Sequence, residues 1–146
     1  MSRFAIIASQ FNGLIVDQLV QGAAQTLAAY DVSKPEIDIF WVPGALEIPI
    51  TAQRAARTRK YDALICLGAV IKGSTDHYEH VSREVHSGIT RVSLDASLPI
   101  TMGVLTVENM AQALERANGT CGNVGSNAAK AAVDTLMAFK QLESNQ

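Results

Sequence analysis

The residues Ala63-Leu64-Ile65-Cys66-Leu67-Gly68-Ala69-Val70 form an uninterrupted apolar run, with no polar residue alternating along it. A strand with water on one face would alternate apolar and polar side chains, so this run predicts a strand covered on both faces. Such strands are typical of parallel sheets, because crossover helices pack on either side of the sheet. The run therefore indicates the α/β class.

Three further apolar runs lie on either side of this strand in the sequence and are also interpreted as buried strands: residues 3–8, 37–42 and 100–106. Segments with helical spacing separate them, and we expect helices over residues 14–30, 45–58, 76–93, 106–116 and from 123–125 to 142. This order, in a single domain of residues 1–146, predicts a right-handed doubly wound sheet. We expect a flavodoxin-like three-layer αβα sandwich with a four-stranded parallel sheet.

Local patterns specify the faces and ends of these helices. The first helix should bury one apolar stripe, made of Leu14, Ile15, Leu19, Ala23, Leu27 and Ala28. Asp76 and Glu79 have the spacing of a capping box at the start of the third helix. Thr106 is expected to cap the fourth helix.

Composition excludes several classes of protein. With 18% charged residues and a formal net charge of -2, the 146-residue chain lacks the basic character of nucleic-acid-binding proteins. It has neither an apolar run of about 18 residues nor a secretory signal, so we expect no membrane partner and a cytoplasmic location. Cys66 and Cys121 have no C-x-x-C or zinc-type neighbours, and we expect both thiols to be reduced and structural.

Ligands of open parallel sheets bind beyond the carboxyl ends of the strands, so the loops there are the candidate site. The first of these loops, Ser9-Gln10-Phe11-Asn12-Gly13, contains none of the usual glycine-rich phosphate-binding motifs. Phe11 could stack on a planar heterocycle, and Asn12 could hydrogen-bond to its ring edge. The alternative is a phenylalanine that caps the core beside an asparagine in a turn.

The second loop reads Pro43-Gly44-Ala45-Leu46-Glu47-Ile48-Pro49. Gly44 and Ala45 would leave backbone N–H groups uncovered at a helix start, and the helix dipole favours Glu47 in the first turn. As a site residue, Glu47 would accept hydrogen bonds from several hydroxyls of a polyol chain. The alternative is an acidic residue that only complements the helix end.

The third loop, residues 68–80, combines lysine, glycine and hydroxyl residues at a helix start, which suits a phosphomonoester. His77 falls in the first helical turn, where the helix dipole favours the neutral imidazole that can move protons at pH 7. His77 and His80 could form a metal pair, but no third ligand is in register, so we predict no metal. Arg116 suits phosphate, although it could equally complement the end of its own helix.

Five strings in chain order closely resemble those of the 6,7-dimethyl-8-ribityllumazine synthase family: residues 11–12, 42–49, 68–79, 103–106 and 115–117. The resemblance implies condensation of 5-amino-6-(D-ribitylamino)uracil with 3,4-dihydroxy-2-butanone 4-phosphate, the penultimate step of riboflavin biosynthesis. Phosphate and water are released, and no cofactor or metal is required. It also implies homopentamers with sites between neighbouring subunits, twelve of which sometimes close into a hollow shell.

The resemblance assigns roles residue by residue. Phe11 would stack on the pyrimidine, and His77 would transfer protons. The ribityl chain would be held by Ala45, Leu46 and Glu47, the ring pocket lined by the backbone of Ala69, Val70 and Ile71, and the phosphate bound by Ser74, Thr75 and Arg116.

Departures from the family pattern and alternative functions accompany these assignments. Met102 stands beside the heterocycle where the family often has phenylalanine, and residues 120–125 lack a lysine that relatives often carry. At the position of Lys72 the family commonly has arginine, so the planar guanidinium group is lost.

Two alternative functions remain. One is a non-catalytic flavin- or lumazine-binding or shell-forming protein. The other is another phosphate-eliminating enzyme acting on a small sugar phosphate.

Overall fold

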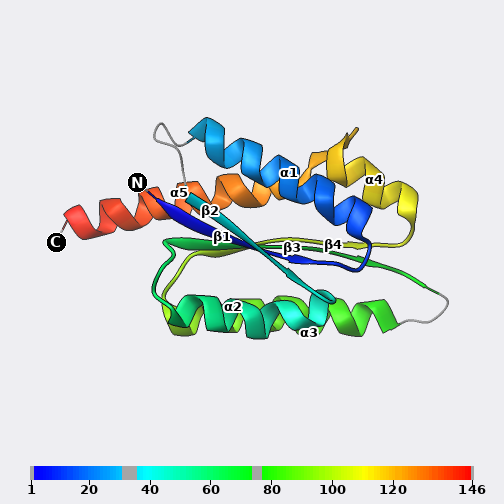
Figure 1. Ribbon diagram of the computed structural model, residues 1–146, viewed down its shortest axis with the longest axis horizontal. Coiled ribbons are helices and arrows are strands. Elements are labelled where there is room, and N and C mark those ends of the chain that lie inside the picture. The colour runs from blue at the N-terminus through cyan, green and yellow to red at the C-terminus, as the bar shows by residue number, and fades with distance from the viewer. Residues whose placement is uncertain (1, 31–35, 74–76, 146) are drawn as a thin grey trace.

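The computed structural model describes residues 2–30, 36–73 and 77–145 and contains a four-stranded parallel sheet in the order β2-β1-β3-β4 (Figure 1). Its strands are β1 (Arg3–Ser9), β2 (Glu36–Val42), β3 (Ala63–Ile71) and β4 (Ile100–Val107). The predicted strands are confirmed to within one residue at each end. A two-residue strand, β5 (Gly122–Asn123), lies outside this sheet and pairs locally.

Helices cover both faces of the sheet, which confirms the three-layer sandwich. On one face lie α1 (Gly13–Tyr30), α4 (Met110–Asn118) and α5 (Val124–Ser144). On the other lie α2 (Ile48–Arg57), preceded by the 3₁₀ turn η1 (Ala45–Glu47), and α3 (His77–Ala96) (Figure 1). None of the described helices is long and apolar enough to cross a membrane.

The central strand β3 is buried from Ala63 to Val70, as its apolar run predicts. It pairs with β1 on one side and with β4 on the other. The side chains of the sheet alternate between two apolar clusters, one shared with α1, α4 and α5 and the other with α2 and α3. Burial also raises the pKa of the Cys66 thiol to about 12, so that this thiol stays protonated at neutral pH.

Strand β2 corrects one expectation, because it is exposed over most of its length rather than buried. It lies at an edge of the sheet, and helices cover little of either face there. Ile39, Phe40 and Trp41 are each exposed by 42% or 43%. Apolar composition predicted the strand correctly, but it did not reveal that this strand has a neighbour on one side only.

The stripe of α1 is also shifted from the predicted one. Leu14 and Ala28 are exposed, whereas Val16 and Val20 are buried. The helix packs against α5 as well as the sheet, so its buried face is turned toward both. Gly125 makes that packing possible, because a Cβ at this position would overlap the backbone of Leu19.

Two predicted features near helix ends are wrong. Thr106 does not cap the fourth helix: Asn109 does, and its side chain accepts a hydrogen bond from the Gln112 N–H at 2.9 Å. Thr106 belongs to β4, and its hydroxyl pairs with that of Ser82 at 2.7 Å. Cys121 was expected to be a structural residue, but its side chain is exposed. Asp76, the predicted cap of the third helix, lies outside the described residues.

Candidate functional site

Phe11 lies just beyond the carboxyl end of β1, on a backbone that is hydrogen bonded to the neighbouring loop. The Gln10 N–H donates to the Val42 carbonyl at 2.7 Å, and the Phe11 N–H donates to the Pro43 carbonyl at 3.1 Å. The Phe11 side chain is 72% exposed, so it does not cap the core. The structure thus presents an aromatic face to solvent on a fixed backbone, as stacking on a planar ring requires.

Asn12 follows in a left-handed backbone conformation, with φ of 59°. Its side-chain amide donates to the Ala69 carbonyl at 3.1 Å and so connects the end of β1 to the end of β3. The Asn12 carbonyl accepts from the N–H groups of Ile15 and Val16 at the start of α1, both at 3.1 Å. The sequence left open a contact of Asn12 with a ring edge and a simple turn residue. In the structure the amide nitrogen donates to the protein's own backbone, and a contact with a ligand stays a prediction.

The turn after β2 places Ala45, Leu46 and Glu47 beside Phe11's loop. Ala45 is buried, Leu46 is 51% exposed and Glu47 is partly buried. The Glu47 Oε1 atom accepts a hydrogen bond from the Gly44 N–H at 2.9 Å. The prediction that this N–H group is left uncovered is therefore wrong. Within the described ranges no hydrogen bond reaches Glu47 Oε2, which leaves this oxygen able to accept from a hydroxyl.

The end of β3 supplies the third wall. Ala69 and Val70 are buried and Ile71 is partly buried, and the role of their backbone in lining a ring pocket stays a prediction. The Lys72 N–H donates to the Val107 carbonyl at 2.9 Å, and the Lys72 Nζ atom lies 5.7 Å from the centre of the Tyr78 ring. Ser74 and Thr75 lie outside the described residues.

His77 is the first residue of α3 and is exposed. It therefore lies at the amino end of a helix, where the sequence placed it. Its ring centre is 6.4 Å from that of His80. In the described part of the chain, no three His, Cys, Asp or Glu side chains are grouped to hold a metal ion.

Met102 does not join the residues around Phe11. It pairs with Cys66, which pairs with Ile7, four residues before Phe11. At about 3.3 Å per residue, Met102 lies roughly 13 Å back along the strands. It is also two strands away across the sheet, a further separation of roughly 10 Å.

Arg116 is on the opposite face of the sheet. It occupies the last turn of α4, which packs on the face of α1 and α5, and its Nη1 atom donates to the Gln112 carbonyl at 3.1 Å. Glu47 and His77 lie at the starts of α2 and α3 on the other face (Figure 1). A single chain therefore separates the predicted residues into two groups.

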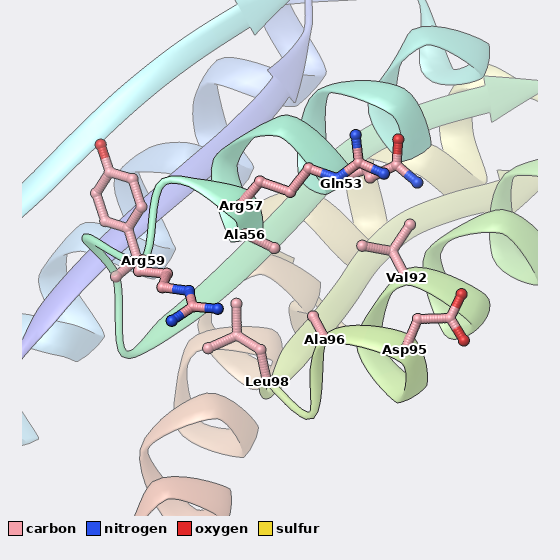
Figure 2. Close-up of a pocket in the computed structure, with 9 residues that line it drawn as sticks. Gln53, Ala56, Arg57, Arg59, Val92, Asp95, Ala96 and Leu98 are labelled. Carbon is pink, nitrogen blue, oxygen red and sulfur yellow. The ribbon is translucent and has the colours of Figure 1, made fainter.

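One hollow lies away from the predicted site residues, and another begins at one of them. A cleft of about 650 Å³ lies between the carboxyl-terminal halves of α2 and α3, where Figure 2 shows Arg57, Arg59 and Leu98 along its walls; it contains no predicted site residue. A groove of about 810 Å³ runs between α1 and α4 and begins at Asn12. Leu14 lines this groove and is 87% exposed. The sequence assigned Leu14 to the core because its spacing fits the apolar stripe.

Comparison with known proteins identifies the family. A family model described as 6,7-dimethyl-8-ribityllumazine synthase matches residues 1–140. The chain belongs to this family. The lumazine synthase resemblance suggested by the five strings is thereby confirmed.

Two relatives carry the name 6,7-dimethyl-8-ribityllumazine synthase. One, from Leuconostoc mesenteroides subsp. mesenteroides, is 46% identical over 142 residues, covering 97% of this chain and 91% of the relative. The other, from Clostridium kluyveri, is 45% identical over 141 residues, covering 97% of this chain and 92% of the relative. The similarity extends over nearly the whole lumazine synthase domain, including every described loop of the site.

Proposed function

We propose that this chain catalyses the condensation of 5-amino-6-(D-ribitylamino)uracil with 3,4-dihydroxy-2-butanone 4-phosphate to 6,7-dimethyl-8-ribityllumazine, releasing phosphate and water. The observation that carries the proposal is the exposed ring of Phe11 on its hydrogen-bonded backbone. The turn of Ala45–Glu47 and the end of β3 flank it, and these are the loops whose strings match the family. The reaction belongs to the transferases.

Binding of the first substrate follows from these surfaces. The pyrimidine stacks on Phe11, and the backbone of Ala69, Val70 and Ile71 lines its edge. The ribityl hydroxyls donate to Glu47, whose Oε1 atom is held by the Gly44 N–H at 2.9 Å. Because that bond fixes the carboxylate, the second oxygen is presented in one orientation, which reduces the entropy lost on binding.

The chemical steps need little more than positioning and proton transfer. The primary amine attacks the ketone to give a carbinolamine and then an imine with loss of water. Elimination releases phosphate, and ring closure with a second dehydration gives the lumazine. Orientation of two substrates contributes about 7–11 kcal/mol, whereas acid–base catalysis contributes roughly 10²–10⁴-fold. His77 therefore assists a reaction that is driven mainly by positioning.

We propose that the site is completed by a second copy of the chain in a homopentamer, alone or within a larger shell. Met102 lies roughly 13 Å back along the strands from Phe11, and Arg116 lies on α4, on the face of the sheet opposite Glu47 and His77. Strand β2 carries Ile39, Phe40 and Trp41 exposed at an edge of the sheet. An edge strand with apolar side chains on both faces is suited to packing against another copy.

Two properties complete the proposal. Ser74 and Thr75 share the phosphate with Arg116 of the neighbouring copy, so that each site takes its phosphate ligands from two chains. The reaction takes place in the cytoplasm, since Cys66 and Cys121 are both free thiols, which suits a reducing compartment.

The test of the reaction is an absorbance assay for lumazine formation from both substrates. A protein-free control corrects for the uncatalysed reaction. Formation well above that control, lost when the phosphorylated ketone is omitted, supports the synthase. Formation at the background rate would instead favour the non-catalytic binding or shell-forming protein. Phosphate release without the ribitylaminouracil would favour an enzyme of sugar phosphates.

The test of shared sites is complementation between two variants that have low activity when the substrates are kept below their wild-type KM values. Phe11→Ala removes the stacking face and Arg116→Ala removes the phosphate ligand. When the two are co-expressed, some neighbouring pairs combine an intact Phe11 with an intact Arg116, and activity should return. If both residues serve one site within a single chain, the activity of mixed assemblies stays as low as that of the two variants alone.

A further inference from the structure

We propose that Asn12 is a positioning residue, which fixes the ring of Phe11 relative to the end of β3 before any substrate binds. The inference rests on the proposed function for the identity of the ligand, but its structural basis is independent of it. The carboxyl ends of β1, β2 and β3 meet at this point. Asn12 is hydrogen bonded to β3 through its side chain and to the start of α1 through its carbonyl.

The first observation is a gap in the sheet. Pairing between β1 and β3 ends at Ala8 and Leu67, whereas β3 continues to Ile71 along β4. Beyond Leu67, the edge of β3 that faced β1 therefore loses its backbone partner. The amide of Asn12 donates to the Ala69 carbonyl at 3.1 Å and replaces that partner. A side chain thus continues the connection where the backbone ladder stops.

The second observation is the backbone of Asn12 itself. Its φ of 59° is a left-handed conformation that asparagine adopts more readily than most residues. This conformation turns the chain from β1 into α1, and the Asn12 carbonyl accepts from the N–H groups of Ile15 and Val16. The residue is therefore held on both sides, by the first turn of a helix and by the end of a strand.

Phe11 is consequently fixed from two directions. Its own N–H is bonded to the Pro43 carbonyl after β2, and the next residue is bonded to Ala69 at the end of β3. The exposed ring has few side-chain contacts to hold it, so these backbone connections set its position. Such preorganisation lowers the entropy lost when a planar ligand enters between the ring and the end of β3.

Two variants separate the side-chain bond from the backbone conformation. Asn12→Gly tolerates the positive φ but removes the amide. Asn12→Asp is similar in size and also tolerates this conformation, but its carboxylate cannot donate to the Ala69 carbonyl. Gln10→Ala is the matched control, because Gln10 is an exposed neighbour in the same loop.

The first measurement is amide hydrogen exchange in the full-length assembled protein without substrate. In both Asn12 variants, residues 10–12 and 69–71 should exchange about tenfold faster, since loss of one hydrogen bond has about that effect. The control should match the wild-type protein. Unchanged exchange in Asn12→Gly would overturn the proposal, and this result does not depend on any activity.

The second measurement is a double-mutant cycle with Phe11→Ala, read as KM for the ribitylaminouracil. Asn12→Gly should raise that KM about tenfold while kcat changes by less than about twofold. In the Phe11→Ala background the same change should have almost no effect, because no ring remains to be positioned. An equal tenfold effect in both backgrounds would mean that Asn12 bonds directly to the ligand. Absence of lumazine formation in the wild-type protein would contradict the proposed function. The positioning role of Asn12 would then be decided by amide hydrogen exchange alone.

Discussion

The ring of Phe11 is exposed although the backbone of its loop is hydrogen bonded to Val42 and Pro43 after β2. Its place after an apolar run predicted that it lies at the carboxyl edge of the sheet, and the structure confirms that. Composition alone favoured a ring that caps the core, because phenylalanine is commonly buried, whereas the family resemblance favoured a ring that stacks on the pyrimidine. The Phe11 backbone is hydrogen bonded to Pro43, and Asn12 is hydrogen bonded to Ala69, while the Phe11 ring stays exposed.

His77→Ala should lower kcat by about 10²-fold and at most about 10⁴-fold, and leave measurable catalysis. The reason is that the larger contribution, orientation of the two substrates, remains in the variant. Initial rates of lumazine formation above the protein-free control measure this effect. His80→Ala is the matched control, since His80 is exposed one turn further along the same helix, and it should keep nearly the wild-type rate. A His77→Ala rate equal to background would show that proton transfer dominates.

Arg116→Ala should raise KM for the phosphorylated ketone by about 10- to 100-fold, since a hydrogen bond to a charged group contributes about 1.5–3 kcal/mol. The KM for the ribitylaminouracil should change far less, because that substrate carries no phosphate. Steady-state kinetics with each substrate varied in turn distinguish the two effects. Arg57→Ala serves as the control, because Arg57 ends α2 beside the unrelated cleft. An unchanged KM for the ketone would remove Arg116 from the site.

Among the helices and strands, the sequence predicted the order of the elements and the limits of the strands. It did not predict the start of the fourth helix at Met110, or which strands the helices cover. The apolar run of β3 and that of β2 are similar, yet β3 is buried and β2 is largely exposed. Apolar composition predicts that a strand is buried. Whether helices of the same chain cover that strand depends on its position in the sheet. Thr106 and Asn109 illustrate the same limit, since both can cap a helix and only the pairing of Thr106 with Val70 of β3 places Thr106 in the strand.

Gly125→Ala should destabilise the fold by about 1–3 kcal/mol or more, as overpacking of a close contact does. A Cβ there would overlap the Leu19 backbone, so α1 and α5 would have to separate. The free energy of unfolding from urea titration, at matched protein concentration, measures the loss. Gly13→Ala is the control, because a Cβ at Gly13 meets nothing within 4 Å. It lies in a helix, where alanine is favoured over glycine, and should not destabilise. Equal stability of both variants would show that α1 and α5 pack less closely than the structure indicates.

Across the chain, the predicted site residues are divided between the two faces of the sheet. Spacing and periodicity did not show this division, although the family resemblance implied sites between neighbouring subunits. Phe11, Glu47 and His77 lie at the carboxyl edge with the starts of α2 and α3. Met102 lies further back on an edge strand, and Arg116 is on α4. The proposed shared site accounts for this division, because it places the second group of one copy against the first group of another.

Trp41→Glu tests this arrangement, because Trp41 lies on β2 with 42% of its surface exposed. A charge on this edge should oppose burial against a second copy, since an unpaired charge at an interface is costly to desolvate. Sedimentation should therefore show smaller species, while circular dichroism keeps the helical signal of the folded chain. Lumazine formation should fall together with the assembly, because each separated chain retains only half of the site residues.

Leu142→Glu is the control for this last prediction. Leu142 is likewise an exposed apolar residue, but it lies near the end of α5, away from both β2 and the carboxyl edge of the sheet. It should leave assembly and activity unchanged. Full activity in a Trp41→Glu protein that sediments as a single chain would show that one copy completes its own site. Met102 and Arg116 would then have to reach Phe11 by a rearrangement within the chain, and the shared site would have to be abandoned.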